Sequence, residues 1–217
     1  MKNLIALLLS AAFLISAASA EVLITANPLK QGKWGILGAY LSDSNLAGGA
    51  TATSPGLYVG YGLTNNLDLF FTAGQSTFGN IGIVPSKTTG YGLSLKYGLF
   101  EESASMPVSV ALGVGSKLLT NDLNNGAVLT GGNQVLAGVI VSKMMIPFVP
   151  YTGLTYRGTT FNGASTQVQT DLTIGTAIAW SMQGAVYLEY TLQSITPNGA
   201  ANYTANQIGL GVGYKLN

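Results

Sequence analysis

Large apolar residues alternate with small or polar ones through residues 58–74, in the stretch YVGYGLTNNLDLFFTAG. The alternation pauses at residues 64–66 (Thr-Asn-Asn) and then resumes, which predicts two antiparallel strands joined by a tight turn. The positions of one parity are Val59, Tyr61, Leu63, Leu67, Leu69, Phe71 and Ala73. The other parity is mostly Gly, Asp and Thr, with Tyr and Phe among them. Which parity faces water decides what kind of protein this is.

The same two-residue period recurs along the chain after residue 20 and predicts ten strands. The predicted ranges are 31–43, 54–63, 67–77, 88–99, 107–119, 133–143, 147–159, 166–180, 184–195 and 204–216. The connections after the second, fourth, sixth and eighth strands are short. The others are longer and rich in Gly, Asn, Ser and Thr, as in NDLNNGAVLTGG. Short turns at one rim and longer loops at the other are typical of membrane-spanning β-barrels.

The two faces of the strands also distinguish a barrel from a soluble fold. A soluble β-sandwich would bury the apolar face and expose the other. That other face is mostly Gly, Ser, Thr and Ala, so it would be poorly solvated and would leave the edge strands unguarded. In a closed barrel it lines the lumen, and the apolar face meets lipid. We therefore expect an all-β protein: a closed antiparallel transmembrane up-and-down barrel of ten strands, with both termini on the short-turn rim. Eight strands is the alternative, because 31–43 alternates weakly and 133–143 is apolar on both faces.

Composition and the N-terminus agree with a membrane barrel. Charged residues make up 8% of the chain and the mean hydropathy is +0.38, whereas a soluble domain carries about 25% charged residues. After residue 20 no run of about eighteen apolar residues could form a spanning helix. Lys2, the apolar run 4–15 and Ala18-Ser19-Ala20 predict a cleaved signal peptide over 1–20. Residues 21–217 are then a single barrel domain, and no Cys follows that would make it a lipoprotein.

Aromatic residues on the apolar parity fall at two levels. From Phe148 to Tyr156 a strand rises about 26 Å, or roughly 20 Å along the barrel axis after a ~40° tilt, close to the ~25 Å apolar band that aromatic girdles flank. The predicted girdle near the short turns is Trp34, Tyr61, Tyr97, Phe148, Trp180 and Tyr214. The predicted girdle nearer the longer loops is Tyr40, Tyr91, Tyr156 and Tyr190.

Two local segments carry a family resemblance. The turn GLTNNLDL (62–69) is similar to the periplasmic hairpin of many porin-like barrels, and the final strand IGLGVGYKLN resembles a C-terminal assembly signal. Over essentially all of 21–217 the chain resembles the small outer-membrane β-barrel proteins of Gram-negative-type bacteria. It departs from them at Asn217, where an aromatic residue is usual. The resemblance implies the bacterial outer membrane as its location, with membrane lipid and the outer-membrane barrel assembly machinery as partners.

The chain has no His and no Cys, which excludes a Ser-His-Asp arrangement, thiol chemistry and a His-ligated metal. The family of omptin-type proteases relies on His, and so do the families of small barrels that act on lipid A. This chain has no His that could serve in either chemistry. Among the carboxylates Asp68, Asp171 and Glu189, no pair is expected to meet, since Glu189 should lie opposite residue 175. We therefore expect no catalytic, cofactor-binding or metal-binding residue, and no enzyme. The chain holds nine Lys and Arg and eight Asp and Glu residues; without Lys2 the signs balance, which argues against nucleic acid as a partner.

Charged residues within the strands should point into the lumen, because a charge against lipid is costly. The predicted lumen charges are Asp68, Lys96, Lys117, Arg157, Asp171, Glu189 and Lys215, with Lys33 beside them. Asp68 is expected opposite Lys96, and Arg157 opposite Asp171. Facing opposite charges stabilise ordinary sheets by about 0.2–1 kcal/mol.

Two functions follow from this architecture. The first is a narrow porin-like channel for small solutes, because ten strands at ~40° give a backbone radius of roughly 9 Å and the inward glycines would leave part of it unfilled. The alternative is a non-conducting structural or adhesive surface barrel that presents its loops. Those loops are nearly uncharged and hold few aromatic anchors, so the sequence slightly favours the channel.

Overall fold

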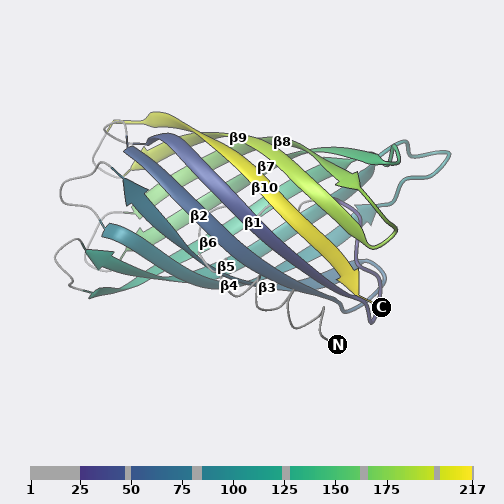
Figure 1. The fold of residues 1–217 in the computed structure, drawn as a ribbon, viewed down its shortest axis with the longest axis horizontal. Helices are drawn as coiled ribbons and strands as arrows, with labels where there is room; N and C mark the ends of the chain where they lie inside the picture. The colour runs from purple at the N-terminus through teal and green to yellow at the C-terminus, as the bar shows by residue number, and fades with distance from the viewer. Residues whose placement is uncertain are drawn as a thin grey trace.

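Ten strands close into one antiparallel barrel in the computed structural model (Figure 1). The structure describes residues 25–46, 50–79, 85–123, 128–161, 166–197 and 201–216, so the predicted signal peptide and Asn217 lie outside the described residues. The strands are β1 (Trp34–Leu46), β2 (Ala50–Gly62), β3 (Leu67–Gly79), β4 (Pro85–Phe100), β5 (Ser109–Leu123), β6 (Val128–Ser142), β7 (Phe148–Phe161), β8 (Thr166–Ala179), β9 (Gly184–Pro197) and β10 (Tyr203–Leu216).

Each strand pairs with its neighbours in sequence, and β1 pairs with β10 to close the barrel. The closing register begins at Trp34 and Leu216, which places the start of β1 and the end of β10 at the same rim. The prediction of a closed ten-stranded antiparallel barrel is confirmed, and the eight-strand alternative is wrong. No helix in the described part of the chain is long and apolar enough to cross a bilayer.

The two rims differ less than the sequence predicted. Residues 63–66, 101–108, 143–147 and 180–183 connect strands at one rim, which we call the turn rim. At the opposite rim, the far rim, the intervals between strands are 47–49, 80–84, 124–127, 162–165 and 198–202. The prediction of longer loops at the far rim is therefore wrong.

The segment between β5 and β6 shows why that prediction failed. Asp122 pairs with Val128, so much of the predicted loop NDLNNGAVLTGG belongs to strands. Its Gly, Asn and Thr residues are typical of turns, yet they continue the backbone ladder. Strands of 13–16 residues rise about 33–40 Å along the axis at a ~40° tilt, further than the ~25 Å apolar band.

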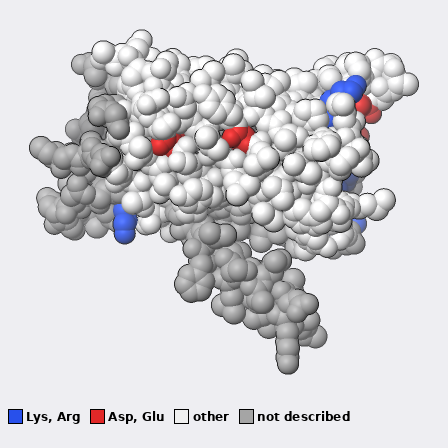
Figure 2. All heavy atoms as spheres, turned by 45° about the horizontal axis from the view of Figure 1, so that its top comes forward, with Lys and Arg blue, Asp and Glu red and all other residues white. Residues whose placement is uncertain are grey.

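The outer face of the barrel is apolar. In the opening hairpin, Phe71 is exposed whereas Asp68 and Thr72 are buried, so the large apolar parity of 58–74 faces outward. Of the ten predicted girdle aromatics, all but Tyr61 are among the exposed large side chains. Tyr61 is half-buried because its ring packs on that of Trp34, with 4.7 Å between centroids. Figure 2 shows uncharged side chains over most of the visible wall, while the visible Lys and Arg side chains lie toward the two ends.

A charge on this outer face should be costly at mid-strand and cheap at the rim. Leu172 lies in the middle of β8 and is 44% exposed, so Leu172→Arg should lower the free energy of unfolding in lipid vesicles by about 2–4 kcal/mol. Thr166→Arg, at the start of the same strand and on the same face, should cost about 0–1 kcal/mol. Equal costs in denaturant titrations would show that this face does not meet hydrocarbon.

Candidate functional site

The lumen is filled by large side chains that sit over inward glycines of neighbouring strands. A Cβ atom built on Gly175 would lie 2.4 Å from the Tyr151 ring, which faces it across β7 and β8. Likewise, a Cβ on Gly213 would lie 2.7 Å from the Tyr187 ring. Similar close approaches join Gly60 to Phe70, Gly209 to Leu41 and Gly211 to Leu37. At these positions the glycines make room for larger neighbours, so the space that they leave is occupied by side chains.

An apolar cluster occupies part of the lumen. Ala26, Ala111, Ile140 and Tyr151 are buried against one another, and Tyr187 packs on them. Ile140 belongs to β6, whose two apolar faces made its parity unreadable from the sequence. The structure resolves this point: the outer apolar face of β6 meets lipid and the inner one packs inside the barrel.

Arg157 and Asp171 form an ion pair inside the barrel, between Nη2 and Oδ2. Their exposures are 1% and 0%. The prediction that they lie directly opposite each other is wrong, since Arg157 faces Gln169 and Asp171 faces Thr155. The long arginine side chain reaches Asp171 along the diagonal, and Gln169 Nε2 donates to Asp171 Oδ1 at 2.7 Å.

Asp43 is a buried lumen carboxylate that the sequence reasoning missed. Its Oδ1 accepts hydrogen bonds from Gln193 Nε2 at 3.1 Å and from Gln207 Nε2 at 2.7 Å. The signal was available, because Asp43 lies inside a predicted strand, where a charge has to turn inward. The weak alternation of that strand hid it. Arg157 interacts electrostatically with this carboxylate as well.

The remaining predicted lumen charges also lie inside the barrel. Glu189 faces Gly175, as expected from the hairpin, and its Oε1 accepts a 2.8 Å hydrogen bond from Tyr151 Oη. Lys117 is buried. Lys215 lies half-buried at the turn rim. Asp68 faces Lys96, and their ion pair measures 3.1 Å between Oδ2 and Nζ.

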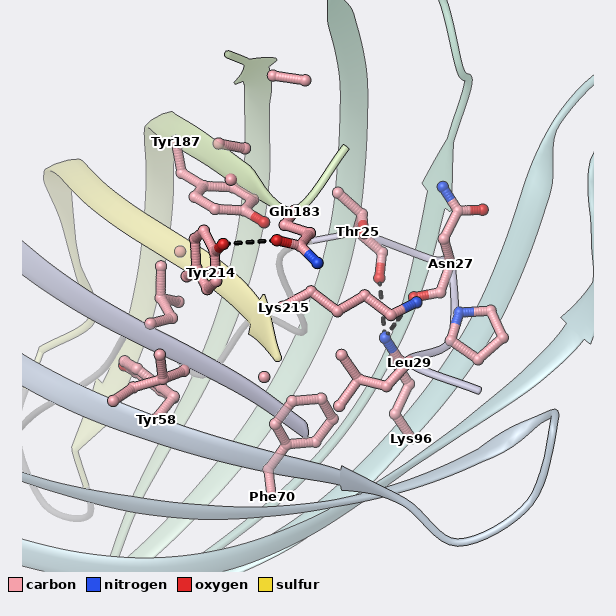
Figure 3. A pocket seen from close by; sticks show the side chains of 18 of the residues that line it. Thr25, Asn27, Leu29, Tyr58, Phe70, Lys96, Gln183, Tyr187, Tyr214 and Lys215 are labelled. Carbon is pink, nitrogen blue, oxygen red and sulfur yellow. Dashed lines mark hydrogen bonds between the residues drawn. The ribbon is translucent and has the colours of Figure 1, made fainter. Parts of the chain in front are cut away.

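The segment 25–32, which precedes β1, enters the lumen at the turn rim and binds the Asp68–Lys96 pair. Leu29 N donates to both carboxylate oxygens of Asp68 at 3.1 Å. Lys96 Nζ donates to the carbonyl oxygens of Thr25 at 3.3 Å and Asn27 at 2.8 Å (Figure 3). The pair thus does more than neutralise itself: it anchors the start of the described chain.

The other contacts of this segment show that it crosses the barrel mouth. On one side, a Cβ on Gly62 of β2 would lie 1.9 Å from the Lys30 carbonyl oxygen, so only glycine fits there. On the other side, Ala26 N donates to Ser142 Oγ of β6 at 3.1 Å. Ser109 Oγ of β5 donates to Asn27 Oδ1 at 2.8 Å. We call residues 25–32 the inner segment; the sequence pattern gave no sign of it, because it does not alternate.

The carboxylates of the lumen are bound by different groups, although Arg157 interacts with Asp43 as well as with Asp171. Among the described residues, no group of three or more His, Cys, Asp or Glu side chains could hold a metal ion. Asp68 binds Lys96 and the inner segment, Asp171 binds Arg157, and Glu189 binds Tyr151. The arrangement orders the lumen and joins the strands through charge-assisted contacts.

Comparisons with known proteins reveal a shared fold. A scan against protein-family models finds no match, and a search of curated proteins finds no significant relative. The chain resembles a bacterial polysaccharide outer membrane secretin at 12% identity and a TM-score of 0.51. The match covers 85% of this chain and 66% of the secretin chain, so this chain spans just under two thirds of the secretin's length. It resembles the COG4313 outer membrane channel from Pseudomonas putida F1 at 10% identity and a TM-score of 0.50, over 93% and 100%. The outer membrane protease OmpT from Escherichia coli matches at 12% identity and a TM-score of 0.48, over 85% and 96%.

At these identities the likeness concerns the fold alone. The chain's own features give its class: a closed barrel, an apolar outer face and outward aromatics at both levels. Only a closed sheet or a helix satisfies all backbone hydrogen bonds in lipid, and barrels of this kind belong to bacterial outer membranes. The protein is an integral outer-membrane β-barrel.

Removing the central lumen cation should destabilise the barrel strongly. Arg157→Met would leave the buried Asp171 without its ion-pair partner, and breaking a buried pair costs about 3–5 kcal/mol. Lys87→Met, at an exposed position on β4, should change stability by less than about 0.5 kcal/mol. Denaturant unfolding in lipid vesicles, followed by tryptophan fluorescence, measures both. A loss below about 1 kcal/mol for Arg157→Met would contradict the buried pair.

The inner segment offers a separate test because the chain has no Cys. Ala26 is 1% exposed, so Ala26→Cys should react slowly with a membrane-impermeant maleimide. Adding Asp68→Asn weakens the two Leu29 contacts and the pairing of Lys96. Because hydrogen bonds to charged groups contribute about 1.5–3 kcal/mol, labelling should accelerate at least about tenfold. Ser103→Cys, on an exposed turn, is the control and should react equally fast with and without Asp68→Asn. If Asp68 does not hold the inner segment, Asp68→Asn will leave the labelling rate of Ala26→Cys unchanged as well.

Proposed function

We propose that the protein is a non-conducting outer-membrane barrel with a structural role in the envelope. The observation that carries the proposal is the burial of charged side chains inside the lumen: Arg157, Asp171 and Lys117 have at most 4% of their surface exposed. An open, water-filled pore would leave such charges in contact with water. Their burial supports the alternative function over the porin-like channel that the sequence favoured.

The packing around these charges supports the same proposal. Ion passage needs a continuous series of water molecules or polar groups that replace the hydration shell of the ion. Tyr151 and Ile140 instead form an apolar cluster with Ala26 of the inner segment. Leu41, next to Gly209, is also buried in the lumen. Passage through this packed region would require several side chains to move together.

A non-enzymatic role fits the placement of the carboxylates. A general acid or base needs a proton-transfer partner at a reacting centre. Asp43 accepts from two glutamine amides, and Asp68 and Asp171 are each bound to a cation. Among the described lumen residues, we therefore assign none to catalysis.

The proposed partners follow from the outer face and the last strand. Membrane lipid covers the apolar wall, and Leu210 and Tyr214 on β10 face outward. We propose that the barrel assembly machinery inserts the chain through this strand, as the resemblance implied, and that nucleic acid is not a partner. Only a few residues separate consecutive strands at the far rim. Connections of this length offer little surface for binding a partner, so we favour the structural role over the adhesive one.

Planar-bilayer recordings test this function directly. The purified full-length barrel should give no current steps, whereas a known porin added afterwards to the same bilayer should give them, which shows that the assay works. Reproducible steps from the unmodified protein would falsify the proposal and restore the channel.

A widened variant shows whether the packed layer is what blocks passage. Tyr151→Ala with Tyr187→Ala removes the rings that lie over Gly175 and Gly213, so it should increase ion leakage. Tyr156→Ala with Tyr190→Ala removes two tyrosines of the outer face and should leave the bilayer silent. Leakage from the outward pair alone would point to damage of the wall rather than to an emptied lumen.

A further inference from the structure

A cavity of about 280 Å³ lies at the turn rim, beside the inner segment. The inner segment contributes Thr25, Asn27 and Leu29 to one wall, and the turn 181–183 together with β9 and β10 forms another (Figure 3). Tyr58 and Tyr187 also line it, and Tyr187 packs against the apolar cluster that occupies part of the lumen. The cavity is therefore a blind recess at one mouth of the barrel, a point that rests on the proposed non-conducting function.

The lining combines apolar surface with positive charge. Phe70, Leu37 and Leu29 supply apolar side chains. Lys96 and Lys215 are the two charged residues of the lining, and no Asp or Glu is among its residues. Figure 3 shows the side chain of Lys215 extending across the recess toward the group formed by Lys96, Thr25 and Asn27.

The two lysines differ in their partners. Lys96 is satisfied by the Asp68 carboxylate and two backbone carbonyls, and its ammonium group lies 5.4 Å from the centre of the Phe70 ring. Lys215 forms no ion pair among the described residues, although the Asp68 carboxylate attracts it at longer range. The Thr72 hydroxyl, on another lining residue, likewise has no hydrogen-bond partner in the described part of the chain. The recess thus offers an unpaired cation and an unpaired hydroxyl.

We propose that this recess binds a small organic anion whose body is aromatic or aliphatic. The anionic group binds Lys215, because a charge-assisted contact is the strong polar contact available there. The body lies against Phe70, Tyr58 and Leu37. Ligand pockets typically range from about 300 to 1,000 Å³, so a recess of about 280 Å³ suits a compact monocarboxylate. A longer or multiply charged ligand would exceed both the volume and the available positive charge.

Calorimetric titration of 1-naphthoate into the full barrel in phosphatidylcholine nanodiscs tests the proposal, with empty nanodiscs as the blank. We expect saturable binding at one site. Lys215→Gln should weaken it about tenfold, and 1-naphthalenemethanol, which has the same aromatic body without the charge, should bind about tenfold more weakly to the unmodified protein. Lys143→Gln is the matched control, because Lys143 is an exposed lysine at the turn rim that does not line the recess. Its Nζ donates to the Pro107 carbonyl. This substitution should leave the affinity for 1-naphthoate unchanged.

A second variant separates the recess from the membrane surface. Ser94→Leu adds volume at a lining position of β4 and should abolish binding while the heat-modifiable migration of the folded barrel is kept. Equal affinity in Lys215→Gln, or heat no greater than that of empty nanodiscs, would overturn the site. If the same protein conducts and still shows Lys215-dependent binding, the non-conducting function fails and the site stands. If the protein gives no current steps and does not bind 1-naphthoate, only the proposed binding site is wrong and the non-conducting function stands.

Discussion

The matching of inward glycines to large side chains on neighbouring strands is the constraint on which the interior of this barrel depends. Ten tilted strands enclose a lumen of roughly 9 Å backbone radius, too wide to be filled by small residues alone. Gly175 and Gly213 admit the rings of Tyr151 and Tyr187 close to the backbone. Because glycine has no side chain, a ring from the adjacent strand can approach the backbone at each of these two positions. Packing contacts, rather than empty space, therefore occupy much of the lumen.

Filling the lumen removes water from beside its charges, and this determines how the charges are arranged. A buried ion is tolerated when a counter-ion and hydrogen bonds replace its hydration. Arg157 pairs with Asp171, and Asp43 takes two amide donors from Gln193 and Gln207. These contacts link β1, β7, β8, β9 and β10 across the interior. The polar groups thus fix the relative positions of strands whose outer faces meet only lipid.

At the turn rim, a glycine that admits a close neighbour and a buried ion pair both hold a segment that lies outside the sheet. Asp68 and Lys96 bind backbone groups of the inner segment, and Gly62 leaves room for the carbonyl of Lys30. The segment closes one side of the mouth and leaves the recess beside β9 and β10. Lys215 borders that recess without a carboxylate partner among the described residues. The recess and its lysine therefore lie at one end of the barrel, where an exogenous group can reach them.

The sequence by itself determined the strands, the outward parity and the inward direction of the charges. Each of these depends on a local two-residue period, because alternate residues of a strand face either the lipid or the lumen. It also predicted the Asp68–Lys96 register, since the centre expected for the hairpin of the third and fourth strands sets which residues face each other. Only the tertiary structure decided what fills the lumen. The contact of Tyr151 with Gly175, the diagonal reach of Arg157 and the return of Ala26 to Ser142 join residues on different strands or outside the sheet. Such contacts depend on closure of the barrel and on side-chain size, and neither leaves a period in the sequence.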